Sequence, residues 1–263
     1  MAGNSAFIMV EERGWRGGLR NLLRVESGKW WRSRMWWIQT LMWTLIINGI
    51  LAGILWGGDA IGAIDAVSLY TIFSGLFPAV AVVIIMQDAL VGEKESGTAA
   101  WIMSKPVSRT AFVLAKWIAN SLGVLVTMLL IPGIVAYIQI SLAIGTWLDP
   151  LRFLGGIGVM YVHQLYYLSL TLMLGAFFAH RGPVIGIPLA LTFGQQMIFG
   201  LLPFLIQVLP WTLIAPIGDM NVSITSALIL DQPLPSLTPF YISLVSIVVF
   251  TVLAFWRFER EEF

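Results

Sequence analysis

Most of the residues that could take part in chemistry lie in one polar stretch, residues 87–120, between two strongly apolar blocks. Within it, the charged triplet 93–95 precedes a short amphipathic run, residues 99–105, which stops at Pro106. A proline disfavours helical geometry in the residue before it, so the run is expected to form one short helix. A short helix with an apolar face suits a groove on a partner protein. The stretch therefore indicates protein docking; the alternative is a helix that lies on lipid without a partner.

Two residues before this run favour a sharp turn into it. Gly97 can adopt backbone conformations that other residues avoid. Thr98 belongs to the residue types that cap helix N-termini. We expect Gly97 to turn the chain and Thr98 to cap the short helix.

The sequence lacks the patterns of common catalytic and metal sites. It contains no G-x-x-x-x-G-K-[ST] phosphate loop and no G-x-S-x-G nucleophile motif. It has no cysteine, and neither of its two histidines, His163 and His180, stands at metal-ligand spacing. We therefore expect no catalytic residue, no metal site and no cofactor bound by this chain, and no nucleic-acid partner.

The composition is typical of a polytopic membrane protein. Only 11% of the 263 residues are charged and 58% are hydrophobic, whereas a soluble domain has about 25% charged residues. The mean hydropathy is +0.86. The first long apolar stretch begins at Met35, after a charged region of more than thirty residues. We expect the N-terminus to be retained, because a cleaved signal peptide would have its apolar region much closer to the first residue.

Six segments approach the length of about 20 apolar residues that a membrane-spanning helix needs. The predicted fold is therefore an all-α polytopic membrane protein with six transmembrane helices, a single transmembrane domain over residues 1–263. The predicted spans are 35–57, 66–86, 111–131 (with a continuation to 144), 153–178, 184–207 and 238–256.

The basic residues predict the orientation. An even number of spans places both termini on one side, and with both in the cytoplasm every Lys and Arg except Arg152 falls in a cytoplasmic segment. That distribution follows the positive-inside rule, and tryptophans gather near the predicted span ends as in aromatic belts. We predict an integral, multi-pass protein of the cell (plasma or inner) membrane with both termini cytoplasmic.

Two flanking segments also carry membrane signals. Residues 10–34 are predicted to form an interfacial amphipathic helix with a bend at Gly17-Gly18, because arginines and apolar residues occupy different sides; the alternative is a solvated basic arm. Residues 208–237, the outer connection, have an apolar middle too short to span. We expect one or two short helices there that re-enter the outer leaflet. On the predicted interfacial helix, the charged side carries Arg13, Arg16, Arg20 and Arg24. The apolar side carries Trp15, Leu19, Leu22 and Leu23.

The polar stretch resembles the membrane subunits of type-2 ABC exporters. In that family the pattern reads approximately G-E-[KR]-x-x-G-T, a short helix, S-[KR]-P-[VI]-[ST]-R, and a lysine that begins the next span. Here Gly92 to Thr98 reads GEKESGT, Ser104 to Arg109 reads SKPVSR, and Lys116 follows. The whole chain is similar in architecture, with an amphipathic N-terminal helix, six spans and a long outer connection before the last one.

The resemblance implies that residues 88–110 form a cytoplasmic coupling segment that docks on an ATPase. It further implies a homodimer or heterodimer of permease subunits surrounded by membrane lipid. Two separate ABC ATPase subunits on the cytoplasmic side would bind the ATP and Mg. By this resemblance, the segment begins with Glu93, Glu95, Gly97 and Thr98. Its apolar docking surface consists of Trp101, Ile102 and Met103. It ends with Lys105, Pro106 and Arg109.

Two further patterns lie inside the spans. Gly49, Gly53 and Gly57 recur at every fourth position and permit close helix packing; the resemblance implies a dimer interface there, and packing within the subunit is an equal alternative. Polar residues of the fourth and fifth spans could line a path or form interhelical hydrogen bonds. These residues are His163, Gln164, Tyr167, Thr171, Gln195 and Gln196.

The sequence thus favours the permease subunit of an ATP-driven exporter that moves an unidentified substrate, with ATP hydrolysed on a separate chain. One alternative is a membrane scaffold subunit of a larger complex. Another is a gradient-driven carrier, which would need ionisable groups within the spans. Such groups are scarce here.

Overall fold

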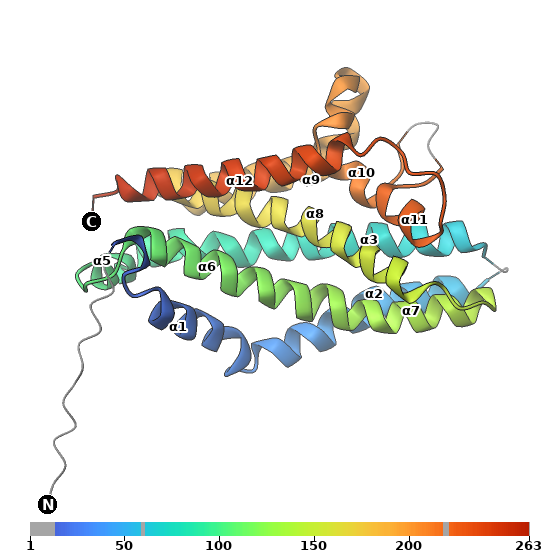
Figure 1. Ribbon diagram of the computed structural model, residues 1–263, viewed down its shortest axis with the longest axis horizontal. Coiled ribbons are helices and arrows are strands. Elements are labelled where there is room, and N and C mark those ends of the chain that lie inside the picture. The colour runs from blue at the N-terminus through green and yellow to red at the C-terminus, as the bar shows by residue number, and fades with distance from the viewer. Residues whose placement is uncertain (1–13, 59–60, 218–220, 263) are drawn as a thin grey trace, which may run out of the picture.

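The computed structural model describes residues 14–58, 61–217 and 221–262, without the side chains of residues 196 and 198. Within these ranges all regular structure is helical, and the long helices run side by side in a bundle (Figure 1). Five described helices are long and apolar enough to cross a membrane, which confirms the multi-pass, all-α prediction. They are Met35–Trp56, Ala63–Glu95, Arg109–Ala143, Pro150–Phe177 and Thr238–Glu259.

The second of these helices runs unbroken from the bundle into the polar stretch. α3 (Ala63–Gln87) continues through one π-helical turn, η2 (Asp88–Gly92), into α4 (Glu93–Glu95). The sequence predicted a span over 66–86, so the helix extends beyond the predicted span end. A π-helical turn within an α-helix is uncommon and is frequent at functional sites. The short α5 (Thr98–Met103) follows α4.

The next long helix has three parts. α6 (Arg109–Val124) passes through a second π-helical turn, η3 (Leu125–Leu130), into α7 (Ile131–Ile144). This confirms the predicted continuation of the third span toward residue 144. Pro132 lies at the start of α7, where its missing N–H is accommodated by the preceding irregular turn.

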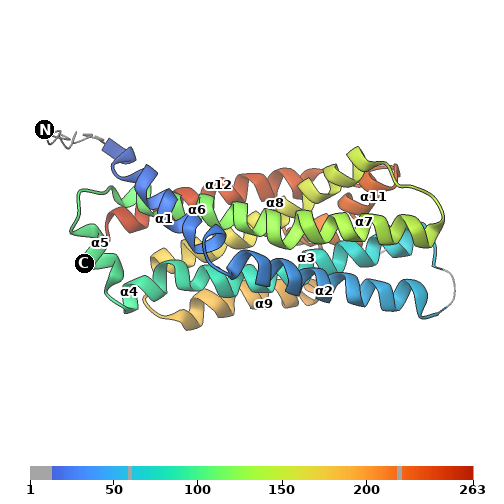
Figure 2. The ribbon, with the colours of Figure 1, turned by 90° about the horizontal axis from the view of Figure 1, so that it is seen from below.

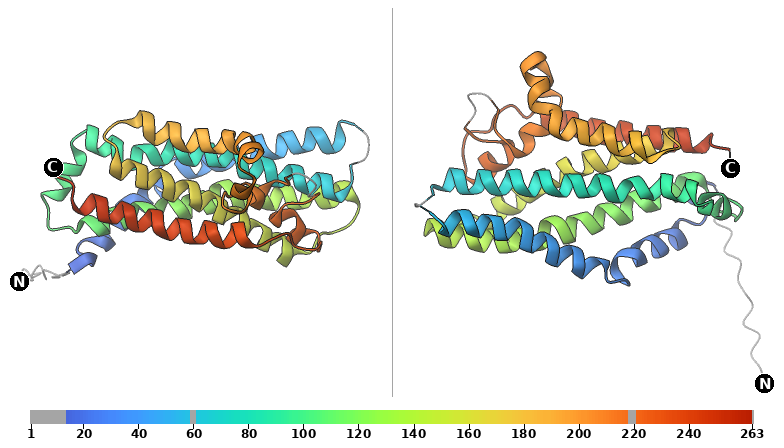
Figure 3. Two further views of the ribbon diagram at one scale, coloured as in Figure 1. Left: turned by 90° about the horizontal axis from the view of Figure 1, so that it is seen from above. Right: turned by 180° about the vertical axis from the view of Figure 1, so that it is seen from behind.

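α8 (Pro150–Phe177) is the central helix. Asp149 caps it by accepting from the backbone N–H groups of Leu151 and Arg152 at 2.8 and 3.0 Å. Its most apolar window is 78% buried, against 28% for α2 (Met35–Trp56) and 22% for α12 (Thr238–Glu259). α3 and α12 pack on α8 (Figure 3). Much of the apolar surface of the flanking helices α2 and α12 is therefore not covered by the described residues.

The predicted fifth span, 184–207, corresponds to α9 (Arg181–Leu201) followed by η4 (Pro203–Gln207). The helix is shorter than predicted, since Leu202 leaves helical geometry at φ −134° immediately before Pro203. A residue that precedes proline is pushed toward extended conformations. α9 is not among the five helices that qualify as spans in the described part of the chain, so six spans remain a prediction.

The outer connection folds back onto the bundle. It contains the two short helices α10 (Trp211–Ile214) and α11 (Ile224–Ile229), both largely buried. The Thr71 hydroxyl of α3 donates to the Ile214 carbonyl oxygen at 2.8 Å, and Thr225 donates to the Leu213 carbonyl at 2.5 Å. The predicted short helices are thus present, and protein covers their backbone.

The N-terminal segment packs against the bundle. After η1 (Gly14–Arg16), the chain bends at Gly18, with φ 75°, into α1 (Leu19–Trp31), which crosses α6 (Figure 2). The bend is as predicted, while residues 10–13 lie outside the described part of the chain. A Cβ atom on Gly18 would meet Val107 Cγ1 at 2.3 Å. α1, α5 and the end of α12 gather at one end of the bundle, opposite α10 and α11 (Figure 1).

Candidate functional site

The three charged residues of α4 each bind a different part of the molecule. The Glu93 carboxylate accepts from Lys116 Nζ of α6 at 2.6 Å. Lys94 Nζ donates to the Ala176 carbonyl of α8 at 3.1 Å and pairs with Glu261 after α12 at 3.2 Å. Glu95 accepts from Arg181 Nε, at the start of α9, at 2.8 Å. The sequence placed Glu93 and Glu95 at the beginning of a segment that docks on a partner protein, and in the structure the triplet connects the polar stretch to the bundle.

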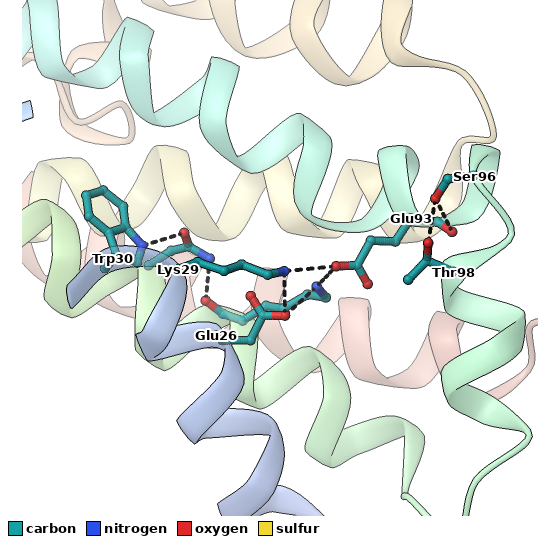
Figure 4. A network of polar contacts seen from close by, with 8 residues as sticks. Glu26, Lys29, Trp30, Glu93, Ser96 and Thr98 are labelled. Atoms are coloured by element: carbon teal, nitrogen blue, oxygen red, sulfur yellow. Dashed lines mark hydrogen bonds and ion pairs between the residues drawn. The ribbon is translucent and has the colours of Figure 1, made fainter. Parts of the chain in front are cut away.

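Four side chains form an ionic cluster, which we define as Glu26, Lys29, Glu93 and Lys116 (Figure 4). Glu26 Oε1 accepts from Lys29 Nζ at 2.9 Å and from Lys116 Nζ at 3.0 Å. Lys29 also donates to Glu93 at 3.1 Å. The Lys116 side chain is only 1% exposed, and a buried cation needs such carboxylate partners. The ionic cluster therefore joins α1, α4 and α6.

Burial and charge act in opposite directions on the two α1 members of the cluster. Burial would raise the pKa of Glu26, but the charges of Lys116 and Lys29 outweigh it and hold this pKa below its usual value. Burial would lower the pKa of Lys29, but Glu26 and Glu93 outweigh it and raise that pKa. Both side chains are therefore ionised near neutral pH.

Trp30 fixes α1 on α6 beside the ionic cluster. Its indole Nε1 donates to Asn120 Oδ1 at 3.0 Å in a buried contact. Its ring covers Gly123, where a Cβ atom would meet Trp30 Cδ2 at 2.3 Å. Asn120 also donates to the Lys116 carbonyl oxygen at 2.8 Å. The position of α1 thus depends on a glycine at 123.

The end of α12 is held by the start of α6. Arg109 Nη1 donates to the carbonyl oxygens of Glu259 and Glu261 at 2.6 and 2.5 Å. The Thr110 hydroxyl donates to the Glu259 carboxylate at 2.6 Å. Arg109, predicted to end the coupling segment, therefore also anchors the C-terminal helix.

α5 presents one large apolar side chain to solvent. Trp101 is 65% exposed, and Lys105 Nζ lies 5.0 Å from the centre of its ring. Ile102 and Met103 are half-buried and pack against the core. Of the three residues predicted to form the docking surface, Trp101 is therefore the exposed one, while Ile102 and Met103 partly pack against the bundle. The helix ends at Met103, shortly before Pro106, as predicted.

The expected helix cap at Thr98 is wrong. Gly97, with φ 72°, occupies the N-cap position, and Thr98 is the first helical residue. The Thr98 hydroxyl lies 2.9 Å from that of Ser96 and makes no cap bond. A side-chain cap needs a residue with extended backbone geometry at the N-cap position. Here Gly97 occupies that position in the left-handed conformation, so Thr98 already belongs to the helix.

A cleft of about 650 Å³ opens beside the ionic cluster. Residues from α1, α2, α3, η2, α4, α6 and α9 line it, and they include Arg181, whose Nη2 pairs with Asp88 at 3.0 Å. A Cβ atom on Gly92 would meet Asp88 Oδ1 at 2.1 Å, so the ion pair requires glycine there. Within the described residues, no group of three or more His, Cys, Asp and Glu could hold a metal ion.

The family of this chain follows from a match between its sequence and a family model. The sequence model described as "ABC-2 family transporter protein" matches residues 20–263. The chain belongs to the ABC-2 transporter family. The membrane proteins of this family lack an ATPase domain. No curated protein matches the chain.

In this ABC-2 protein, two of the three glycines of the α2 ladder have no close neighbour in the described part of the chain. A Cβ atom on Gly49 or Gly53 would meet nothing within 4 Å. At Gly57, after the end of α2, it would meet the Gly53 carbonyl oxygen at 2.2 Å. The structure therefore gives no packing role within the subunit to Gly49 and Gly53.

The predicted polar residues of the fourth and fifth spans are buried between helices. Gln164 Nε2 donates to the Gly75 carbonyl of α3 at 2.8 Å, and Gln195 Nε2 donates to the Tyr167 hydroxyl at 2.8 Å. Thr171 donates to the Tyr167 carbonyl at 2.7 Å. These bonds favour the packing interpretation over a path.

Two further polar residues complete this set. The His163 ring lies edge-on to Tyr167, with 5.1 Å between ring centres. The side chain of Gln196 lies outside the described residues. His163, like the polar residues bonded between the helices, does not line the cleft.

Sequence reasoning missed the α1 half of the ionic cluster. A signal was present: Glu26 is the only acidic residue between Arg13 and Arg34, and Lys29 and Trp30 follow it at helical spacing on the same face. Lys116 stands near the beginning of the predicted third span, and a lysine within a span is expected to have an acidic partner.

Proposed function

We propose that this ABC-2 protein is the permease subunit of an ATP-driven exporter, with ATP and Mg bound on separate ATPase subunits. The observation that carries the proposal is α5, which presents Trp101 to solvent on a segment anchored to several helices. Exposed aromatic side chains are typical anchors of protein interfaces. Residues 88–110 would form the cytoplasmic coupling segment, and two ATPase subunits would dock on a pair of permease subunits.

The proposed topology has six spans, with α9 as the fifth and both termini in the cytoplasm of the cell membrane. The gathering of α1, α5 and the end of α12 at one end of the bundle agrees with an even number of crossings (Figure 1). In this frame α10 and α11 would re-enter the outer leaflet, and α1 would lie at the inner membrane surface.

The coupling would work through direct connections. A push on α5 reaches α4, which continues as one helix into α3. The same push reaches α6 and α1 through Glu93, α8 through Lys94 and α9 through Glu95. Movement of this one segment would therefore bias most of the bundle at once, as an energy-coupling element must.

The second permease subunit, identical or related, would pack on α2. This helix exposes Gly49 and Gly53 together with Leu45, which is 64% exposed. Small residues on an exposed apolar helix face allow close approach of another helix in the membrane. A contact between α2 helices of two subunits would use this face.

The test is co-purification of the tagged protein from its native membrane, comparing wild type with Trp101→Ala. We expect an ABC ATPase with wild type and a loss of about thirtyfold in the variant, since a central interface tryptophan contributes about 2 kcal/mol or more. The matched control is Trp56→Ala, a tryptophan 55% exposed at the far end of α2. It should retain the ATPase.

Two outcomes would contradict the proposal. If no ATPase accompanies the wild-type protein, a scaffold role in a larger complex becomes the better description. If Trp56→Ala loses the ATPase to the same extent as Trp101→Ala, the loss reflects damage to the fold and α5 is not the docking element.

A further inference from the structure

The cleft beside the ionic cluster combines an apolar wall with charged groups. Met35 at the start of α2 and Ile84 of α3 line it and are 40% and 52% exposed. Glu26, Lys29 and Glu93 also line it. The cleft lies where α2 begins and where the predicted span of α3 ends, which is the boundary between hydrocarbon and head groups. A site of this kind suits a molecule with a charged head and an apolar tail.

Two buried acceptor atoms at the cleft have no hydrogen-bond partner among the described residues. Gln87 is 8% exposed, and its Oε1 is unpartnered. Glu93 uses Oε1 for both lysines of the ionic cluster, which leaves its buried Oε2 without a partner. Buried polar atoms without partners are rare in native proteins. Both atoms accept, so a ligand group that bonds to them must be a donor.

Two half-exposed cations at the same cleft can bind an anionic group. Lys29 has three N–H donors and uses two of them, on Glu26 and Glu93. Arg181 pairs with Asp88 and Glu95, and the guanidinium has five N–H donors. Their side chains are 54% and 47% exposed. A phosphate diester bound here would accept hydrogen bonds from Lys29 and Arg181 without displacing any of the carboxylates that pair with them.

The charges of the cleft balance. The acidic residues are Glu26, Asp88 and Glu93, and the basic residues are Lys29, Lys116 and Arg181. A neutral zwitterion can therefore enter without leaving an uncompensated charge, whereas an anionic lipid adds one in a partly buried site. A quaternary ammonium carries no N–H donor and could not satisfy Gln87 Oε1 or Glu93 Oε2.

We propose that the cleft binds the head group of a zwitterionic aminophospholipid, of the phosphatidylethanolamine type. The primary ammonium would donate to Gln87 Oε1 and Glu93 Oε2, the phosphate would accept from Lys29 and Arg181, and an acyl chain would lie along Met35 and Ile84. This site requires the chain to span a membrane, and it does not depend on ATPase docking.

The experiment is native mass spectrometry of the purified full chain in detergent. The protein is titrated separately with phosphatidylethanolamine, phosphatidylcholine and phosphatidylglycerol of identical acyl chains. For wild type we expect one phosphatidylethanolamine to bind about tenfold more tightly than either other lipid, as one or two hydrogen bonds to a charged group predict.

The test variant is Gln87→Leu, which removes one unpartnered acceptor and leaves the ionic cluster intact. It should reduce the preference for phosphatidylethanolamine over phosphatidylcholine about fivefold, the effect of one lost hydrogen bond. The matched control is Gln139→Leu, because Gln139 also has a buried unpartnered Oε1 but lies on α7 away from the cleft. This control should keep the wild-type preference.

Equal binding of phosphatidylethanolamine and phosphatidylcholine by wild type would overturn the proposal, since it indicates adventitious lipid of the detergent belt. A preference for phosphatidylglycerol would overturn it in favour of an anion site. An equal loss in the two leucine variants would also overturn it, as would an unchanged preference in Gln87→Leu. The wild-type comparison stands even where a variant fails to fold. Loss of ATPase co-purification with an intact lipid preference would instead contradict only the proposed function.

Discussion

Gly123 is the residue whose smallness decides where α1 lies. The Trp30 ring occupies the space of the missing side chain, and its indole N–H is bonded to Asn120 on the preceding turn of α6. Tryptophan buries a large apolar area and usually finds a hydrogen-bond partner when buried. One glycine and one amide thus hold the N-terminal helix against the bundle.

We predict that Gly123→Ala displaces Trp30 and destabilises the protein by about 1–3 kcal/mol, the usual effect of overpacking a filled site. The measurement is the thermal unfolding midpoint of the purified protein in detergent. Gly158→Ala is the control, because a Cβ atom on this α8 glycine meets nothing within 4 Å. It should be neutral or slightly stabilising, since alanine favours a helix interior. A midpoint unchanged by Gly123→Ala would mean that Trp30 does not pack there.

At the scale of elements, α1 and α4 are joined to α6 by ionised groups, so their docking depends on pH. The lowered pKa of Glu26 means that its contribution is present above the ordinary value of 4.5 and is lost as the pH falls through the lower folded value. The raised pKa of Lys29 means that its contribution is present below 10.5 and is lost as the pH rises through the higher folded value.

We therefore predict that α1 stays docked between about pH 5 and pH 10 and loosens only outside that window. Because the chain has no cysteine, a fluorescent probe on Asn21→Cys reports on α1 alone, through its anisotropy. Glu26→Gln should abolish the acid transition contributed by this carboxyl and lower the anisotropy at neutral pH. A transition centred near pH 7 in the parent protein would show that groups other than Glu26 and Lys29 control the docking.

For the whole molecule, the number of membrane crossings determines which end of the bundle faces the cytoplasm and which faces the outside. Our topology places Ser104 and Gly182 in the cytoplasm and Gln232 outside. Because residue 182 lies at the start of α9 and residue 232 follows its end, opposite locations require the chain to cross the membrane between them. These positions test directly whether α9 crosses the membrane, as a topology of six spans requires.

Single cysteines at Ser104, Gly182 and Gln232, all exposed positions, provide the measurement. In intact cells a membrane-impermeant maleimide should label only Gln232→Cys, and the other two should react after permeabilisation, with at least about a tenfold difference. Labelling of Gly182→Cys and Gln232→Cys from the same side would remove α9 as a span. Labelling of Ser104→Cys in intact cells would reverse the proposed orientation.

The membrane character, the helical class and the position of the polar stretch could all be predicted from the amino-acid sequence. Length and apolarity are local properties, so the predicted spans match five long helices of the structure, including the continuation of α6 into α7. The glycine bend at Gly18 and the end of α5 before Pro106 were also predictable, because backbone restrictions act on the residue itself or its neighbour.

The partners of the charged residues could not be predicted from the sequence, because they depend on how the helices pack. Glu26 and Lys116 are 90 residues apart in sequence, and nothing local specifies that they meet. The same applies to the division of the α5 surface, where packing buries part of Ile102 and Met103 and leaves Trp101 exposed. Thr98 had the right chemistry for a cap, but the left-handed turn at Gly97 gave it a helical position. Pairing across helices depends on how they pack, and that requires the whole fold.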